Sequence, residues 1–128
     1  MCEANCPFCE LPAERIVFSA SEARVVRDAF PVSPGHTLVI PLRHIGSFFE
    51  LTAVERDCMF ELLVRAKAEL DHTFQPDGFN IGINGGAASG QTVPHLHLHL
   101  IPRYRGDVPD PRGGVRWVVP AKAKYWAE

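Results

Sequence analysis

The stretch from Gln91 to Pro102 limits the possible folds of this chain more than any other. Its histidines His95, His97 and His99 alternate with leucines at 96, 98 and 100. Alternation with a period of two predicts a β-strand with one apolar and one polar face. We therefore predict a strand at 95–101 that carries three imidazoles on one face. A half-exposed strand whose polar face carries histidine by chance is the less favoured interpretation.

The spacing of these imidazoles argues against one shared role. Side chains two positions apart on a strand lie about 6.5–7 Å apart, and the outer pair lies at about twice that distance. We therefore expect His95, His97 and His99 to have different roles. The main alternative is a catalytic zinc ion held by a His-x-His pair, because imidazoles two positions apart can converge on one ion.

Length and composition indicate one compact domain. The chain has 128 residues, 46% of them hydrophobic, which suffices for one core and leaves no room for a second domain. A formal net charge of -2 gives no basic field for a nucleic acid polymer. The N-terminus lacks the basic start and apolar run of a secretory signal, and no later segment reaches membrane-spanning length. We expect a cytoplasmic protein without a membrane partner.

Cys6 and Cys9 form a Cys-x-x-Cys pair, whereas Cys2 and Cys58 have no evident partners. A structural zinc ion takes four N or S ligands, so the pair is half of such a site and histidines are candidates for the rest. In a reducing compartment this spacing favours metal or redox chemistry over a structural disulfide. A redox motif and a turn without a ligand remain as alternatives to zinc.

The remaining segments predict further strands and one long helix. Thr52 and Glu55 form a capping box, so a helix is expected from residue 52 to about residue 74. Its apolar residues recur every three or four positions, and its charged residues, Glu55 among them, are expected on the other faces. Runs rich in Val, Ile and Phe predict a β-hairpin at 15–19 and 23–28 and strands at 37–41, 79–84 and 117–120.

Several residues near the predicted strand ends are candidates for ligand binding. Asp28 is suited to accept hydrogen bonds from ribose hydroxyls, although a solvated turn residue is the favoured interpretation when Asp28 is taken alone. The glycines between 85 and 90 let backbone amides approach a phosphate, or they simply connect two strands. Four arginines after the triad strand are suited to a polyphosphate or to a solvated loop; they are Arg103, Arg105, Arg112 and Arg116.

Asp28, Pro34-Gly-His36, Asn84 and the run from Gln91 to His99 together resemble the histidine triad (HIT) family of nucleotide hydrolases and transferases. The lead-in Gln-Thr-Val resembles the fragile histidine triad branch, which cleaves diadenosine polyphosphates. The Cys-x-x-Cys pair instead resembles zinc-containing members, and residues 112–120 match neither branch well. The resemblance covers nearly the whole chain. It implies one α+β domain over 1–128, with about five antiparallel strands, one long helix and commonly a homodimer.

The resemblance also implies roles for individual residues. His97 would attack the α-phosphorus of a nucleotide, while His99, His36 and Gln91 surround the phosphate. Asp28, Asn84, Gly90 and Thr92 would bind the nucleotide, and Ile16, Phe18 and Phe30 would wall the base. A structural zinc ion would be held by Cys6, Cys9, His44 and His95.

The expected function follows from these roles. It is hydrolysis of diadenosine polyphosphates or related nucleotide conjugates through a nucleotidyl-histidine, with adenine nucleotides favoured and no organic cofactor. An adenosine phosphoramidase and a nucleotide-binding module without catalysis are the alternatives. A metallohydrolase with His97 and His99 on a catalytic ion is a further one.

Overall fold

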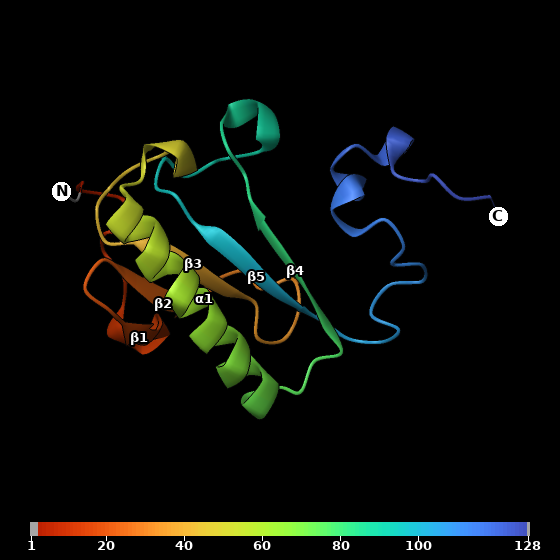
Figure 1. Cartoon of the computed structure of the whole chain (residues 1–128), viewed down its shortest axis with the longest axis horizontal. Helices are drawn as coiled ribbons and strands as arrows, with labels where there is room; N and C mark the ends of the chain where they lie inside the picture. Colours follow the sequence, from red (N-terminus) through yellow and green to blue (C-terminus); the bar gives the residue numbers. More distant parts are fainter. Residues whose placement is uncertain (1–2, 128) are drawn as a thin grey trace.

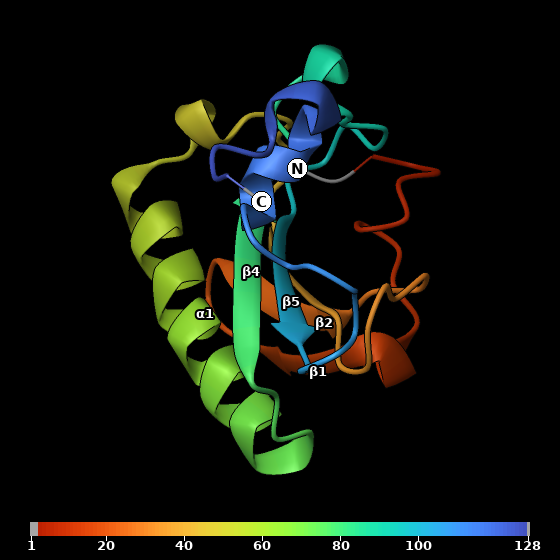
Figure 2. The ribbon, with the colours of Figure 1, turned by 90° about the vertical axis from the view of Figure 1, so that its right-hand side faces the viewer.

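The computed structural model describes residues 3–127, and within them five strands form one antiparallel sheet covered on one face by a long helix (Figure 1 and Figure 2). The strand order is β1-β2-β3-β5-β4. The expected α+β architecture is confirmed. The elements are β1 (Ile16–Ser19), β2 (Ala23–Arg27), β3 (Thr37–Pro41), α1 (Ala53–Thr73), β4 (Gly78–Ile83) and β5 (Leu98–Arg103).

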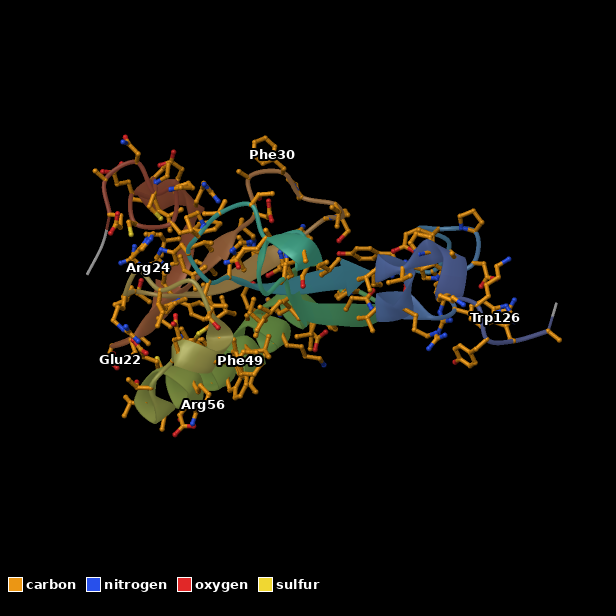
Figure 3. All side chains as sticks on the ribbon, turned by 90° about the horizontal axis from the view of Figure 1, so that it is seen from above. Glu22, Arg24, Phe30, Phe49, Arg56 and Trp126 are labelled. Carbon is orange, nitrogen blue, oxygen red and sulfur yellow. The ribbon has the colours of Figure 1, made fainter. Side chains whose placement is uncertain are left out.

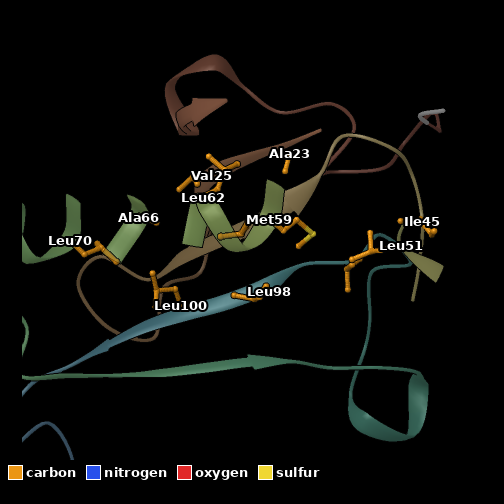
Figure 4. Close-up of a cluster of buried hydrophobic side chains, with 12 residues drawn as sticks. Ala23, Val25, Ile45, Leu51, Met59, Leu62, Ala66, Leu70, Leu98 and Leu100 are labelled. Atoms are coloured by element: carbon orange, nitrogen blue, oxygen red, sulfur yellow. The ribbon is translucent and has the colours of Figure 1, made fainter. Parts of the chain in front are cut away.

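The core lies between α1 and the sheet (Figure 4). Met59, Leu62, Ala66 and Leu70 recur on one side of α1 and are buried against the sheet. Leu98 and Leu100 of β5 belong to the same cluster, so the leucines of the histidine–leucine alternation face the helix. Because side chains alternate along a strand, His99 faces the opposite side of the sheet.

The start of α1 confirms the predicted capping box and corrects one expectation. The Glu55 N–H donates to Thr52 Oγ1 at 3.1 Å, and the Thr52 N–H donates to the Glu55 carboxylate at 2.8 Å. Glu55 was expected on an exposed face, yet it is buried. The reason is Arg43, which donates to both carboxylate oxygens at 2.8 and 2.9 Å and lowers the pKa of Glu55 to about 2.

The triad strand and the tail also differ from the predictions. Strand β5 begins at Leu98, so His95 and His97 precede it, and the Leu96 N–H donates to the Ile45 carbonyl outside the sheet ladder. No strand forms at 117–120. Short 3₁₀ turns span Gly114–Val118 and Pro120–Lys122 instead. The reason is local, since two consecutive glycines at 113 and 114 take positive φ and Pro120 has no N–H for a ladder.

Residues 107–127, here called the C-terminal segment, leave the sheet beside β4, on the side away from β1 (Figure 1). Among the described residues, no helix is both long and apolar enough to cross a membrane. Cys2, which has no evident partner in the sequence, lies outside the described residues, and Cys58 is part-buried on α1.

Candidate functional site

Four side chains with metal-ligating atoms meet where the N-terminal turn joins the sheet. They are Cys6, Cys9, His44 and His95, and their ligand atoms all lie within 4.8 Å of one another. Cys6 Sγ lies 3.3 Å from His95 Nδ1, and Cys9 Sγ lies 3.5 Å from His44 Nδ1. A tetrahedral zinc ion bonded at about 2.3 Å to S and 2.0–2.1 Å to N holds such atoms about 3.6 Å apart. The donor set and its spacing therefore fit zinc.

His95 presents one particular ring nitrogen to this cluster. Its Nε2 lies 2.9 Å from the Pro41 carbonyl oxygen, which only accepts hydrogen bonds, so Nε2 carries the proton. The lone pair is then on Nδ1, which faces both thiol groups. Burial lowers the pKa of His95, whereas burial raises the pKa of the Cys6 thiol. Cys6 therefore needs a nearby cation to become a thiolate, and a zinc ion bound to this cluster would supply it.

The proton on His97 is positioned by the backbone of His95. The His97 Nδ1 lies 2.8 Å from the His95 carbonyl oxygen, so Nδ1 carries the hydrogen. The ring centroid of His97 lies 4.9 Å from that of Phe8 and 5.1 Å from that of His99. In its neutral form, His97 therefore keeps a lone pair on Nε2, where it is able to act as a nucleophile.

Val32, His36 and His99 form a hydrogen-bonded chain, here called the imidazole relay. The Val32 N–H donates to His36 Nδ1 at 3.1 Å, so the proton of a neutral His36 is on Nε2. This Nε2 lies 2.9 Å from His99 Nδ1 and 3.4 Å from the Asp28 carboxylate. When His36 donates to His99, the remaining proton of His99 is on Nε2. His99 is then a hydrogen-bond donor.

Burial keeps the relay uncharged. It is the largest cause of a fall in the pKa of His99 to about 4, and the neighbouring His97 and His36 rings lower that pKa further. Burial also lowers the pKa of His36, although the Asp28 carboxylate opposes the change. His99 is therefore neutral near pH 7 and donates to an anion without being charged itself.

A cavity of about 460 Å³, here called the triad cavity, opens beside these rings. It lies on the sheet face opposite α1, as the direction of His99 requires. Seven of the residues predicted for catalysis or nucleotide binding line it: Asp28, His36, Asn84, Gly90, Thr92, His97 and His99.

Gln91 does not join this group. Its Nε2 donates to the carbonyl oxygens of Gly46 and Val93 at 3.0 and 3.1 Å, and its Oε1 accepts from the Gly86 N–H at 2.9 Å. Gln91 is also not among the residues that line the triad cavity. The structure thus directs this amide into the glycine loop rather than toward a phosphate, because backbone groups engage its oxygen and its nitrogen.

Of the three residues expected to wall the base, only Phe30 lines the triad cavity. The Phe30 side chain projects from the surface (Figure 3). Phe18 instead packs on the α1 side, where the Arg65 guanidinium lies 4.2 Å from its ring centroid. Ile16 packs beside Val26, Leu38 and Ile40 and does not line the cavity. Residues two apart on a regular strand share a face, but a shift in strand register between Ile16 and Phe18 places their side chains on different faces of the sheet.

Sequence reasoning missed some residues of the cavity. Pro7, Phe8, Arg15 and Val32 line it as well. The signal for Phe8 was present, since a residue between two ligands of a site that includes His95 must lie near the triad. The four arginines expected near a polyphosphate do not line the triad cavity; Arg103, at the end of β5, bonds instead to Asp107 and Asn80.

The metal-ligating groups also bear on the catalytic zinc alternative. Among residues 3–127, two groups have the required spacing: the Cys/His cluster and Asp28 with His36 and His99. Neither includes His97. In the second group a hydrogen bond already joins His36 to His99. This geometry does not support an ion shared by His97 and His99.

Comparison with known families identifies this arrangement. A family model described as the HIT domain matches residues 10–106. The chain belongs to the HIT domain family. An uncharacterized HIT-like protein of Methanocaldococcus jannaschii is 38% identical over 107 residues, which cover 80% of this chain and 81% of that protein. The resemblance found in the sequence is therefore confirmed.

Two further HIT relatives bear on the chemistry. The crystal structure of a Zn-bound histidine triad family protein from Mycobacterium smegmatis matches with a TM-score of 0.72 and 31% identity, covering 91% of this chain and 92% of that one. The bis(5'-nucleosyl)-tetraphosphatase (asymmetrical) of Schizosaccharomyces pombe is 40% identical over 77 residues, which are 60% of this chain and 42% of that enzyme. The HIT domain match ends at residue 106, before the C-terminal segment.

Proposed function

We propose that this HIT protein hydrolyses diadenosine polyphosphates or related nucleotide conjugates through a nucleotide attached to His97. The observation that carries the proposal is the hydrogen bond from His97 Nδ1 to the His95 carbonyl, which leaves the Nε2 lone pair available beside a cavity. The bis-nucleosyl-tetraphosphatase relative supports the substrate class.

The reaction proceeds in two displacements at the α-phosphorus. His97 Nε2 forms a P–N bond while the P–O bond to the leaving group breaks, and the leaving group departs with that electron pair as an anion. Water then forms a new P–O bond, the P–N electron pair returns to Nε2, and the proton of the water passes to solvent. A nucleoside monophosphate is released. The covalent intermediate divides one difficult step into two easier ones.

The neighbours of His97 supply the other roles. His99 and Thr92 donate to phosphate oxygens, where charge moves in the transition state. His36 fixes the proton of His99 through the relay. Asn84 and the Gly90 backbone contact the nucleotide, and Asp28 accepts from the ribose. Gln91 acts indirectly by holding the glycine loop in place.

The Cys/His cluster holds a structural zinc ion in this proposal. The ligands are Cys6, Cys9, His44 and His95, so the metal ties the N-terminal turn to the residues after β3 and before β5. The zinc-bound relative supports this assignment. Zinc requires the cysteines as reduced thiolates, which agrees with a reducing compartment such as the cytoplasm.

A homodimer is also proposed, with β4 at the interface. This strand lies at one edge of the sheet, and edge strands present unpaired backbone groups. Ile81 on β4 is 50% exposed, and Phe60 and Val64, one turn apart on α1, are 45% and 71% exposed. Phe60 and Val64 lie near β4, because Lys67, one turn further along α1, lies 5.7 Å from the centroid of Phe79 on that strand. An exposed apolar surface beside a free edge favours a second copy.

The decisive variant is His97→Ala. It should lower the turnover of diadenosine tetraphosphate by at least about 1,000-fold, as expected for loss of a nucleophile. Its zinc content and its thermal unfolding midpoint should match the wild type, since His97 is outside the cluster. Acid quenching with radiolabelled substrate should trap a labelled histidine only in protein that keeps His97. His72→Ala, at the exposed end of α1, is the matched control.

Other results select the alternatives. Hydrolysis that persists in His97→Ala and stops at once with a chelator favours a metallohydrolase. Nucleotide binding without turnover of any phosphoanhydride or phosphoramidate favours a binding module. Turnover restricted to adenosine phosphoramidate changes the substrate class but keeps the nucleophile.

A further inference from the structure

Three hollows adjoin one another on the sheet face opposite α1. The triad cavity shares Val32, His36, Asn84 and His99 with a middle hollow of about 320 Å³. The middle hollow in turn shares Val32 and Ile101 with a third one of about 520 Å³, here called the C-terminal cavity. Together they form a trough that starts at the reacting histidines.

The C-terminal cavity is formed partly by residues beyond the HIT domain match. Val108, Pro111 and Trp117 contribute to its wall from the C-terminal segment, while Ile101 contributes from β5. Its volume lies within the usual range of small-molecule sites, about 300–1,000 Å³. An aromatic ring and aliphatic side chains suit a flat, largely apolar group.

The charged groups of this cavity are paired. Asp107 accepts from Arg103 at 2.7 and 2.8 Å, and this guanidinium holds the pKa of Asp107 at about 2. Asp110 accepts from Arg112 at 2.9 Å. Both carboxylates of the wall are thus compensated, Asp107 by Arg103 of the wall and Asp110 by Arg112, which does not line the cavity. Such a lining suits an uncharged ring better than an amine, a sulfate or a free phosphate.

The position of the cavity indicates which part of a substrate reaches it. Arg103, which lines it, stands four residues after His99 on β5, about 13 Å along the strand. A leaving group held there is joined to the reacting α-phosphate by a linker that crosses the middle hollow. A chain of several phosphates followed by a second nucleoside has that shape, whereas ammonia or sulfate ends before it.

We infer that the C-terminal cavity binds the nucleoside of the leaving group, with Trp117 as its main contact. The inference rests on the proposed function and specifies its substrate as two nucleosides joined by several phosphates. The leaving nucleoside polyphosphate takes the electron pair of the broken P–O bond while its base remains in the cavity. The C-terminal segment is then the part of the chain that determines the leaving group.

The test compares two substrates that share the transferred adenylate. Diadenosine tetraphosphate carries a second nucleoside, whereas adenosine 5′-phosphoramidate releases only ammonia. Trp117→Ala should lower kcat/KM for the tetraphosphate about tenfold, as expected for loss of one aromatic contact. It should leave kcat/KM for the phosphoramidate within twofold. Tyr125→Ala, an exposed aromatic on the same segment that does not line the cavity, should change neither value.

A second variant guards against misfolding of Trp117→Ala. Val108→Phe fills the cavity and keeps Trp117, so it should reduce turnover of the tetraphosphate alone. Equal losses of kcat/KM for both substrates, or no loss for either, would overturn the inference. The proposed function would still stand in that case, provided that turnover still requires His97. Loss of the His97 requirement would instead overturn the proposed function, and the subsite with it. A wild-type enzyme that accepts only the phosphoramidate also contradicts the subsite.

Discussion

The protonation of single ring nitrogens determines what each histidine contributes. The carbonyl of Pro41 fixes the proton of His95, the carbonyl of His95 fixes that of His97, and the Val32 N–H does so for His36. In each of these three histidines, one backbone group therefore selects the tautomer of the neutral ring. The same kind of side chain is thereby suited to act as a metal ligand, a nucleophile or a hydrogen-bond donor.

His99 should make the fold sensitive to acid. Its pKa is about 4 in the folded chain, whereas an unfolded histidine has a pKa of about 6.5. Below pH 6.5 the unfolded chain binds a proton that folded His99 does not, so stability is present above pH 6.5 and is lost as the pH falls toward 4.

Urea unfolding between pH 7 and pH 4 checks this expectation. The wild type should lose more stability over that range than His99→Asn does. Loss of zinc in acid affects both proteins and cancels in the difference. Parallel pH profiles for the two would contradict the lowered pKa of His99.

For single residues, the sequence predicted which side chains lie at the site better than it predicted how they are oriented. The resemblance to the HIT family had named seven of the residues that line the triad cavity and the four residues of the Cys/His cluster. The proton positions could not be predicted, because they depend on carbonyls distant in sequence, such as Pro41 for His95. The orientation of Gln91 was unpredictable for the same reason, since Gly46 is one of its partners.

Among the elements, the Cys-x-x-Cys turn joins the Cys/His cluster to His97. Phe8 stands between Cys6 and Cys9, lines the triad cavity and packs against His97. The turn has no strand or helix of its own to hold it. A metal bound at the Cys/His cluster would therefore fix Phe8, which packs against the His97 ring.

Removing the metal should affect both stability and turnover. Cys9→Ser should lose zinc. When the free concentration of a ligand is about a thousand times its Kd, losing that ligand lowers the free energy of unfolding by about 4 kcal/mol. In a domain of this size the unfolding midpoint then falls by about 15 °C. The kcat should fall as well, because Phe8 is released. Cys58→Ser on α1 is the control and should keep its metal, measured by mass spectrometry of the protein-bound zinc.

Periodicity predicted the elements well where one face is buried. Helix α1 and strands β1 to β4 were predicted to within a few residues. Strand β5 starts later than the alternation suggested, since Leu96 pairs with Ile45 rather than with a strand neighbour. The tail was wrong because its Val-rich run has no sheet partner and turns at glycines.

For the molecule as a whole, the free edge at β4 predicts association. Ile81→Lys places a charge on the proposed interface, and charged side chains are a common barrier to edge pairing. This variant should sediment as a monomer at concentrations where the wild type is a dimer. Val54→Lys alters an exposed valine at the other end of α1 and should remain dimeric. A monomeric wild type would contradict the proposed interface.

The two roles proposed for His95 depend on different atoms of the residue. The metal contact belongs to the imidazole, whereas the acceptor for the His97 proton is the peptide oxygen, which every amino acid supplies. Divergence at this position is therefore able to eliminate the ion and still preserve the tautomer. A variant without the proposed metal would need only another way to hold the N-terminal turn in order to keep the hydrogen bond to His97.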